Sequence, residues 1–203
     1  MKDIDTIIFD LGGVLINWDP RKVYRTIFKT ENEIDWFFEN ICTSDWNETQ
    51  DSGYPISKAT EERVAQYPEW EKEIRAFYGR WEEMLGGPIQ ETLDLFKELK
   101  QNPSFKFYAL TNWSAETFPI ALKRFEFLEW FDGILVSGEE KTRKPFSGFY
   151  QKLLDKYSID SFKAIFIDDN LRNVKAGENL GIKGIHFTDP ANLKLRLNEL
   201  KLL

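Results

Sequence analysis

The chain has 203 residues, of which 42% are hydrophobic and 30% are charged, and its formal net charge at pH 7 is −7. This length suits one globular domain, or a core with a modest insertion, which can bury a hydrophobic core without disulfides or a structural metal. The negative charge argues against nucleic acid or an anionic membrane as a partner. The sequence has one cysteine, Cys42, and one histidine, His186, so it offers neither an internal disulfide nor a Cys/His zinc site.

Targeting and membrane signals are absent from the sequence. No apolar run approaches the ~20 residues of a membrane span. The first residues, Met1 to Asp5, lack the basic start and the apolar stretch of a signal peptide. We therefore expect a cytoplasmic protein without a membrane partner, either a monomer or a weak homo-oligomer.

The first strong pattern is the apolar run of residues 6–10, which is rich in β-branched residues and ends on Asp10. Such a run is typical of a strand buried on both faces in a parallel sheet. Gly12-Gly13 interrupts the regular structure directly afterwards. Asp19-Pro20 then has the form of a helix start.

Residues 21–85 follow a different pattern. Apolar residues recur there at helical spacing, without a strand-like run, so we expect three or four packed helices. Gly86-Gly87-Pro88 ends this insertion, and Pro88 is expected to open the next helix.

Strands and helices alternate over the rest of the chain. This alternation predicts an α/β fold, a Rossmann-like doubly wound parallel sheet with helices on both faces. The expected division is a core of residues 1–17 and 86–203 with an inserted all-helical domain of residues 18–85. Further strands are predicted at residues 106–111, 133–137, 164–168 and 183–187.

Polar and acidic residues stand at the ends of three predicted strands. Asp10 ends the first, Thr111 ends the second, and Asp168-Asp169 ends a later one. In open α/β sheets, ligands bind outside the carboxyl ends of the strands. Carboxylates gathered there repel one another, and a hard divalent cation compensates them.

The sequence contains Asp10, Thr111, Lys144 and Asp168-Asp169 in this order. This order resembles that of the site residues in the haloacid dehalogenase superfamily. The helical insertion between the first two motifs is similar to the cap of cap subclass I, which places the chain in subfamily IA. Within it, the chain is similar to the α-D-glucose-1-phosphate phosphatase type. The four matching segments are Phe-Asp-Leu-Gly-Gly-Val-Leu at 9–15, Leu-Thr-Asn at 110–112, Arg-Lys-Pro at 143–145 and Phe-Ile-Asp-Asp-Asn at 166–170.

The resemblance implies a Mg²⁺-dependent phosphatase acting on a small phosphorylated metabolite, such as a sugar phosphate. Asp10 is then the nucleophile that forms an aspartyl-phosphate, and Lys144 offsets negative charge and fixes Asp10. Thr111 and the backbone N–H of Asn112 bind the phosphoryl group. The Mg²⁺ ligands implied are Asp10, the carbonyl of Gly12, and Asp168, with Asp169 beside them or acting through a water.

One position departs from the family pattern. Phosphatases of this family have a second Asp two residues after the nucleophile as general acid and base, and here that position is Gly12. General acid–base catalysis is typically worth about 10²–10⁴ in rate. A water, a cap residue or a substrate with a good leaving group could compensate, and no residue in the sequence identifies the replacement.

Two other functions are compatible with parts of the pattern. A metal-independent 2-haloacid dehalogenase needs no leaving-group acid, but gives the Asp168-Asp169 pair less reason to exist. A non-catalytic relative that binds a phosphorylated metabolite is supported only by Gly12. Trp46, Gln50 and Tyr54 lie near the turn in the insertion, where they could face the substrate or belong to the core of the insertion.

Overall fold

The computed structural model describes residues 4–203 and confirms the predicted α/β fold with a parallel sheet and an inserted group of helices. The first three residues, which belong to the predicted core segment 1–17 and to the N-terminal stretch without signal-peptide features, lie outside the described part. The main sheet has the order β5-β4-β1-β6-β7, and all its neighbouring strands are parallel. Its strands are β1 (Thr6–Phe9), β4 (Lys106–Thr111), β5 (Gly133–Val136), β6 (Ala164–Asp168) and β7 (Lys183–His186).

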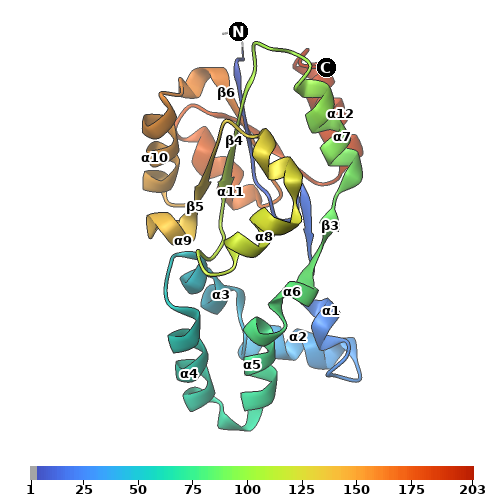
Figure 1. Ribbon diagram of the computed structural model, residues 1–203, viewed down its shortest axis with the longest axis vertical. Coiled ribbons are helices and arrows are strands. Elements are labelled where there is room, and N and C mark those ends of the chain that lie inside the picture. The colour runs from blue at the N-terminus through green and yellow to red at the C-terminus, as the bar shows by residue number, and fades with distance from the viewer. Residues whose placement is uncertain (1–3) are drawn as a thin grey trace.

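Helices cover both faces of this sheet, as Figure 1 shows. Between residues 4 and 203, none of the helices is both long and apolar enough to cross a membrane. The helices that follow the insertion are α7 (Gln90–Leu99), α8 (Phe118–Arg124), η2 (Glu126–Trp130), α9 (Ser137–Glu140), α10 (Ser147–Tyr157), η3 (Ser161–Lys163), α11 (Leu171–Glu178) and α12 (Pro190–Glu199).

The alternation of side chains along the strands builds two hydrophobic cores. Ile7 and Phe9 of β1 belong to the cluster that contains the apolar residues of α7 and α12. Ile8, between them, belongs to the cluster with Phe149 and Leu153 of α10. Because successive side chains of a strand point to opposite faces, the continuous apolar run predicted for this segment buries the strand on both sides.

Strand register brings the predicted site residues to one edge of the sheet. β1 lies between β4 and β6, and Phe9 is level with both Ala109 and Ile167. The backbone N–H of Asp10 donates to the carbonyl of Ile167 at 2.8 Å. Asp10 and the ends of β4 and β6 therefore lie next to one another.

The inserted segment has more helices than the sequence predicted, because turns divide the expected long helices. Six α-helices and one 3-10 helix lie between residues 21 and 84, all within the described chain. They pack around a core of their own that includes Tyr24, Phe37, Trp46 and Phe77. They are α1 (Arg21–Tyr24), α2 (Glu31–Asn40), α3 (Ser44–Asp51), α4 (Ile56–Gln66), η1 (Pro68–Trp70), α5 (Glu71–Gly79) and α6 (Trp81–Met84).

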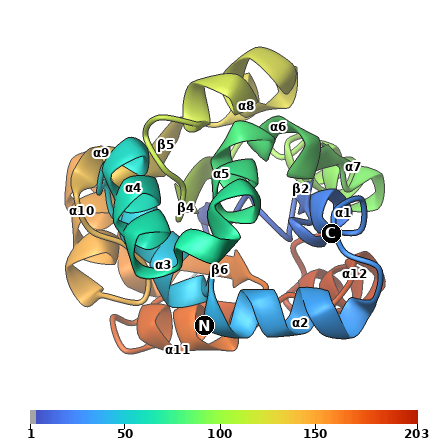
Figure 2. The same cartoon turned by 90° about the horizontal axis from the view of Figure 1, so that it is seen from below.

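A two-stranded antiparallel ribbon joins the inserted helices to the sheet. It pairs β2 (Ile16–Trp18) with β3 (Leu85–Pro88). The prediction that Pro88 opens a helix is wrong, because Pro88 ends β3 and α7 begins at Gln90. Figure 1 shows the helical group beyond the carboxyl ends of the parallel strands, and Figure 2 shows it from below, where α3 and α5 lie over the sheet.

Polar contacts hold the helical group against the sheet. The hydroxyl of Ser137 donates to the carbonyl of Asp51. The backbone N–H of Ile56, at the first turn of α4, donates to the carboxylate of Glu116 at 2.8 Å. The carboxylate of Glu48 on α3 forms ion pairs of 2.6 Å with both Arg143 and Arg172 of the sheet domain. These contacts close the helical group over the sheet edge that bears Asp10.

Replacing Phe96 by alanine is expected to lower the free energy of unfolding by about 3–5 kcal/mol, the usual cost of truncating a buried phenylalanine. Its ring is fully buried and lies 5.1 Å from Phe9 and 4.8 Å from Phe131, centroid to centroid. Leu122→Ala, at a position that is 51% exposed, is the control and should change the stability by at most about 0.5 kcal/mol. Denaturant unfolding measures both, and equal effects would contradict the core described for this face.

Candidate active site

A buried lysine links two carboxylates at the centre of the site. The ammonium group of Lys144 lies 2.8 Å from Asp10 Oδ2 and 2.7 Å from Asp168 Oδ2. The side chains of Lys144 and Asp168 are fully buried, and that of Asp10 is 11% exposed. Three residues that are far apart in the sequence, all predicted as site residues, therefore meet in direct contact.

The side chain of Asn112 fixes the backbone of Lys144. Its amide nitrogen donates to the carbonyl of Lys144 at 3.0 Å, and its amide oxygen accepts from the N–H of Lys144 at 2.8 Å. The guanidinium of Arg143 also donates to the carbonyl of Lys144, at 3.0 Å. The sequence assigned only the backbone N–H of Asn112 to the site, so this positioning by its side chain is a new finding.

Asp168 is held from several directions. The side-chain amide of Asn173 donates to both of its carboxylate oxygens, at 3.1 and 3.2 Å, and the N–H of Asn170 donates to Oδ1 at 2.8 Å. The hydroxyl of Tyr150 donates to the carbonyl of Asn173 at 2.8 Å. Since Asn170 and Asn173 lie at the start of α11, the turn after β6 orients the carboxylate that ends this strand.

The acidic cluster has more negative charge than its lysine can balance. Asp10, Asp168 and Asp169 each offer an oxygen atom, all within 4.8 Å of one another, and the ammonium of Lys144 pairs with Asp10 and Asp168. Burial raises the pKa of Asp10 to about 8; Lys144 opposes this rise, while Asp168 and Asp169 add to it. Burial and the neighbouring Asp168 likewise raise the pKa of Asp169.

This donor set fits a divalent cation. Oxygen ligands from carboxylates are the ones that Mg²⁺ and Ca²⁺ prefer. Three carboxylates against one ammonium leave a formal excess of two negative charges, which a divalent cation would offset. Asp10, Asp168 and Asp169 are the residues that would hold it.

Thr111 ends β4 and offers a donor without a partner. Its side-chain oxygen is buried and forms no hydrogen bond within the described protein. A buried hydroxyl left unpaired costs free energy. A ligand oxygen placed between Asp10 and Thr111 would remove that cost.

The two glycines after β1 have different roles. Gly13 has a φ of +77°, and a Cβ atom there would lie 2.4 Å from Oδ2 of Asp169. A Cβ atom at Gly12 would meet nothing within 4 Å. Gly13 is thus required by backbone conformation and by the close approach of Asp169, whereas Gly12 leaves open space.

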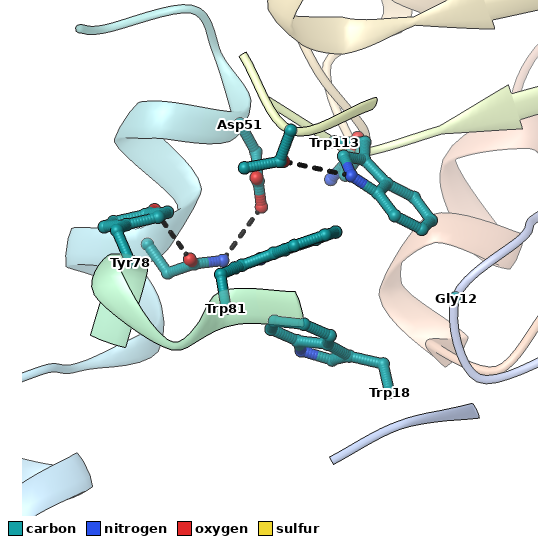
Figure 3. Close-up of a pocket in the computed structure, with 9 residues that line it drawn as sticks. Gly12, Trp18, Asp51, Tyr78, Trp81 and Trp113 are labelled. Atoms are coloured by element: carbon teal, nitrogen blue, oxygen red, sulfur yellow. Dashed lines mark hydrogen bonds between the residues drawn. The ribbon is translucent and has the colours of Figure 1, made fainter. Parts of the chain in front are cut away.

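That open space belongs to a cavity of about 70 Å³ between the sheet and the helical group, which we call the indole cavity. Three tryptophans from separate segments form much of its wall, and Figure 3 shows their indole rings between Gly12 and Asp51. The ring of Trp81 lies 5.2 Å from that of Trp18 and 5.7 Å from that of Trp113. The lining residues are Gly12, Trp18, Asn47, Asp51, Tyr78, Trp81, Asn112, Trp113 and Thr117.

A second, more open space of about 280 Å³, the nucleophile cleft, adjoins the indole cavity. It contains the predicted nucleophile and faces α3 of the helical group. Trp18, Asn47, Asp51 and Asn112 line both spaces. The lining of the cleft is Asp10, Trp18, Pro20, Phe38, Cys42, Thr43, Ser44, Asn47, Glu48, Asp51, Phe77, Asn112, Asp169, Asn170 and Asn173.

The sequence left open whether Trp46, Gln50 and Tyr54 face the substrate or belong to the core of the insertion, and the structure places none of them in these two spaces. Trp46 and Tyr54 line a separate hollow of the helical group, and Gln50 is buried. Asp51, one residue further on, lines both spaces of the site. The sequence did not single out Asp51, because no local pattern marks an aspartate at the end of a helix as part of a site.

The chain is similar to known proteins over most of its length. A family profile described as haloacid dehalogenase-like hydrolase matches residues 7–187. A sesquiterpene phosphatase from Aspergillus oryzae is 30% identical over 195 residues, which are 95% of this chain and 94% of that protein. A drimenol cyclase from Aspergillus calidoustus is 26% identical over 186 residues; they cover 91% of this chain but only 34% of that protein.

Solved structures share the fold. A HAD family enzyme from Bacteroides thetaiotaomicron, solved in complex with magnesium and inorganic phosphate, is 26% identical with a TM-score of 0.67. The similarity covers 90% of this chain and 93% of that one.

Replacing Lys144 by methionine is expected to lower the free energy of unfolding by about 3–5 kcal/mol in EDTA, because it leaves buried carboxylates unpaired. Added Mg²⁺ should restore part of that loss, since a cation in the cluster compensates the same carboxylates. Lys175→Met, at an exposed position of α11, is the matched control and should leave the stability nearly unchanged. Denaturant unfolding with and without Mg²⁺ measures these effects, and a fully stable Lys144→Met protein in EDTA would contradict the buried ion pairs.

Alanine at Gly13 and at Gly12 should have opposite consequences. Gly13→Ala places a side chain in the left-handed region, at about 1–2 kcal/mol, and its Cβ also collides with Asp169. Gly12→Ala fits the open space and should be neutral or stabilise by up to about 1 kcal/mol, because it restricts the unfolded chain. Thermal unfolding measures the stability of the two variants. Equal destabilisation would contradict the left-handed conformation of Gly13 and the open space at Gly12.

Proposed function

Because this chain belongs to the haloacid dehalogenase-like hydrolase family, we propose that it is a Mg²⁺-dependent phosphatase that hydrolyses a small phosphomonoester through an aspartyl-phosphate on Asp10. The observation that supports this most directly is the contact of Lys144 with both Asp10 and Asp168, beside Asp169. A metal-independent dehalogenase would have little use for two further carboxylates next to its nucleophile.

The chain's own groups suit a phosphoryl transfer. The carboxylate of Asp10 attacks phosphorus and forms an acyl phosphate, which water then hydrolyses. Lys144 holds Asp10 in place, and its charge offsets the negative charge that gathers there. The unpaired hydroxyl of Thr111 is free to donate to a phosphoryl oxygen, with the N–H of Asn112 beside it. A bound divalent cation supplies Lewis-acid stabilisation of the charge on the phosphoryl oxygens.

Relatives support the same chemistry. The A. oryzae protein is named a sesquiterpene phosphatase, and the B. thetaiotaomicron enzyme was solved with magnesium and inorganic phosphate. By analogy we assign the ligands of Mg²⁺ in this chain to Asp10, the carbonyl of Gly12 and Asp168, with Asp169 beside them.

The walls of the indole cavity favour a substrate with an apolar organic group over the sugar phosphate expected from the sequence. Several polar side chains in the wall bond to protein groups: Tyr78 donates to Asn47 at 3.0 Å, and the indole N–H of Trp113 donates to Thr117 at 3.1 Å. The amide of Asn112 is bonded to the backbone of Lys144. The indole faces are left as the contact surface, and hydrocarbon groups bury well against aromatic rings.

Turnover of p-nitrophenyl phosphate tests the proposed reaction. Release of p-nitrophenolate should require Mg²⁺, stop in EDTA, and be abolished in Asp10→Asn, because the amide cannot act as the nucleophile. Asp94→Asn, an exposed aspartate of α7, is the control and should retain wild-type rates. Undiminished activity of Asp10→Asn would exclude the covalent mechanism, and halide release from 2-chloropropionate without metal would favour the dehalogenase.

A further inference from the structure

The proposed nucleophile is Asp10, but Gly12 stands where phosphatases of this family have the acid for the leaving group. The helical group places the carboxyl of Asp51 across the cavity from Gly12. Gly12 and Asp51 both line the indole cavity, and a side chain at position 12 would enter open space there. Figure 3 shows them on opposite sides of this cavity. Because the cavity holds only about 70 Å³, one leaving group within it can contact both walls.

Asp51 also lines the cleft that contains the proposed nucleophile. It lines the nucleophile cleft together with Asp10 and Asn112, so it stands where the two spaces join. A phosphoester with its phosphoryl group at Asp10 and its organic part among the indoles would have its bridging oxygen at this junction. Two carboxylates of α3 line the cleft, but Glu48 is paired with Arg143 and Arg172, and of the two only Asp51 also lines the indole cavity.

The position of Asp51 is fixed by hydrogen bonds. Its carbonyl accepts from the hydroxyl of Ser137, which ties the end of α3 to the sheet domain. Its carboxylate accepts from the amide of Asn47 at 3.0 Å, and the carbonyl oxygen of that amide accepts from the hydroxyl of Tyr78 at 3.0 Å. The amide of Asn47, itself held by Tyr78, therefore orients the Asp51 carboxyl through neutral hydrogen bonds.

Resting on the phosphatase function proposed above, we propose that Asp51 is the general acid of this enzyme and donates its proton to the leaving oxygen in place of the acid absent at Gly12. As the bond from Asp10 to phosphorus forms, the bond from phosphorus to the organic oxygen breaks, and that oxygen takes the proton of Asp51. In the second step water attacks the acyl phosphate and gives its proton to the Asp51 carboxylate. Asp10 leaves as a carboxylate, inorganic phosphate is released, and Asp51 is protonated again.

The surroundings of Asp51 suit both steps. Burial and the nearby Glu48 raise its pKa to about 7, while Arg143, the backbone N–H of Ser114 and Lys144 act in the opposite direction. A group with a pKa near the working pH can both donate and accept a proton.

Two esters with the same ring test the proposal. p-Nitrophenyl phosphate has a leaving group that needs no proton, whereas p-nitrobenzyl phosphate releases an alkoxide that does. In Asp51→Asn, kcat/KM should fall about 10²–10⁴-fold for the benzyl ester and less than about tenfold for the phenyl ester. Asp45→Asn, the same substitution at an exposed position of α3, should match the wild type with both.

The pH dependence gives a readout that a purely structural role would not change. For the benzyl ester, kcat/KM of the wild type should fall as pH rises through about 7, since only protonated Asp51 can donate. This fall should be absent with the phenyl ester and in Asp51→Asn. With the phenyl ester, Asp51→Asn should release one equivalent of p-nitrophenolate in a burst, because hydrolysis of the acyl phosphate lacks its base.

The outcomes separate this proposal from the function on which it rests. If the wild type releases phosphate from neither ester in Mg²⁺, the phosphatase function itself fails. If the wild type is active and Asp51→Asn loses the same factor with both esters, or nothing with either, the general-acid role of Asp51 is excluded. Circular dichroism and thermal unfolding of the variant confirm that it is folded for this comparison.

Discussion

The ammonium of Lys144 is the constraint on which the site depends, because it lies between carboxylates that could not otherwise be buried together. Removing a carboxylate from water costs several kcal/mol. The attraction of a neighbouring lysine offsets this cost only when the two groups are in direct contact and well oriented. That geometry comes from the parallel sheet, which sets Asp10 beside the end of β6, and from the side chain of Asn112, which clamps the backbone of Lys144.

The cluster is nevertheless left incomplete by the protein. The cluster holds three carboxylates and one lysine. Burial is the main cause of the raised pKa values of Asp10 and Asp169, and the neighbouring carboxylates add to it. Such an imbalance is unfavourable for folding alone and becomes favourable when a divalent cation binds. The same reasoning applies to the unpaired hydroxyl of Thr111, which a ligand oxygen would satisfy.

The helical group gives the second half of the site. The sheet edge alone presents the proposed nucleophile Asp10 and the charged cluster, while Asp51, Trp81 and Tyr78 come from the inserted helices. Their positions are fixed by contacts across the two parts, including the ion pairs of Glu48 with Arg143 and Arg172. Trp81 and Tyr78 of the cavity wall belong to this insertion, whereas Trp113 follows β4 in the sheet domain. Substitutions at Trp81 and Tyr78 can therefore change the choice of organic group without altering the acidic cluster of the sheet.

The sequence by itself determined the fold class and most of the sheet-edge residues. Apolar runs that end on Asp10 and Asp168 mark buried parallel strands, since burial on both faces leaves a local pattern that needs no distant contact. The sequence did not determine how turns divide the inserted helices, that Pro88 ends a strand, or that the side chain of Asn112 holds the backbone of Lys144. Only the tertiary structure decided that Asp51, and neither Trp46 nor Tyr54, lines the indole cavity and the nucleophile cleft. A local pattern can predict which face of a helix is buried, but which residue at the end of that helix meets another segment depends on how the two parts pack.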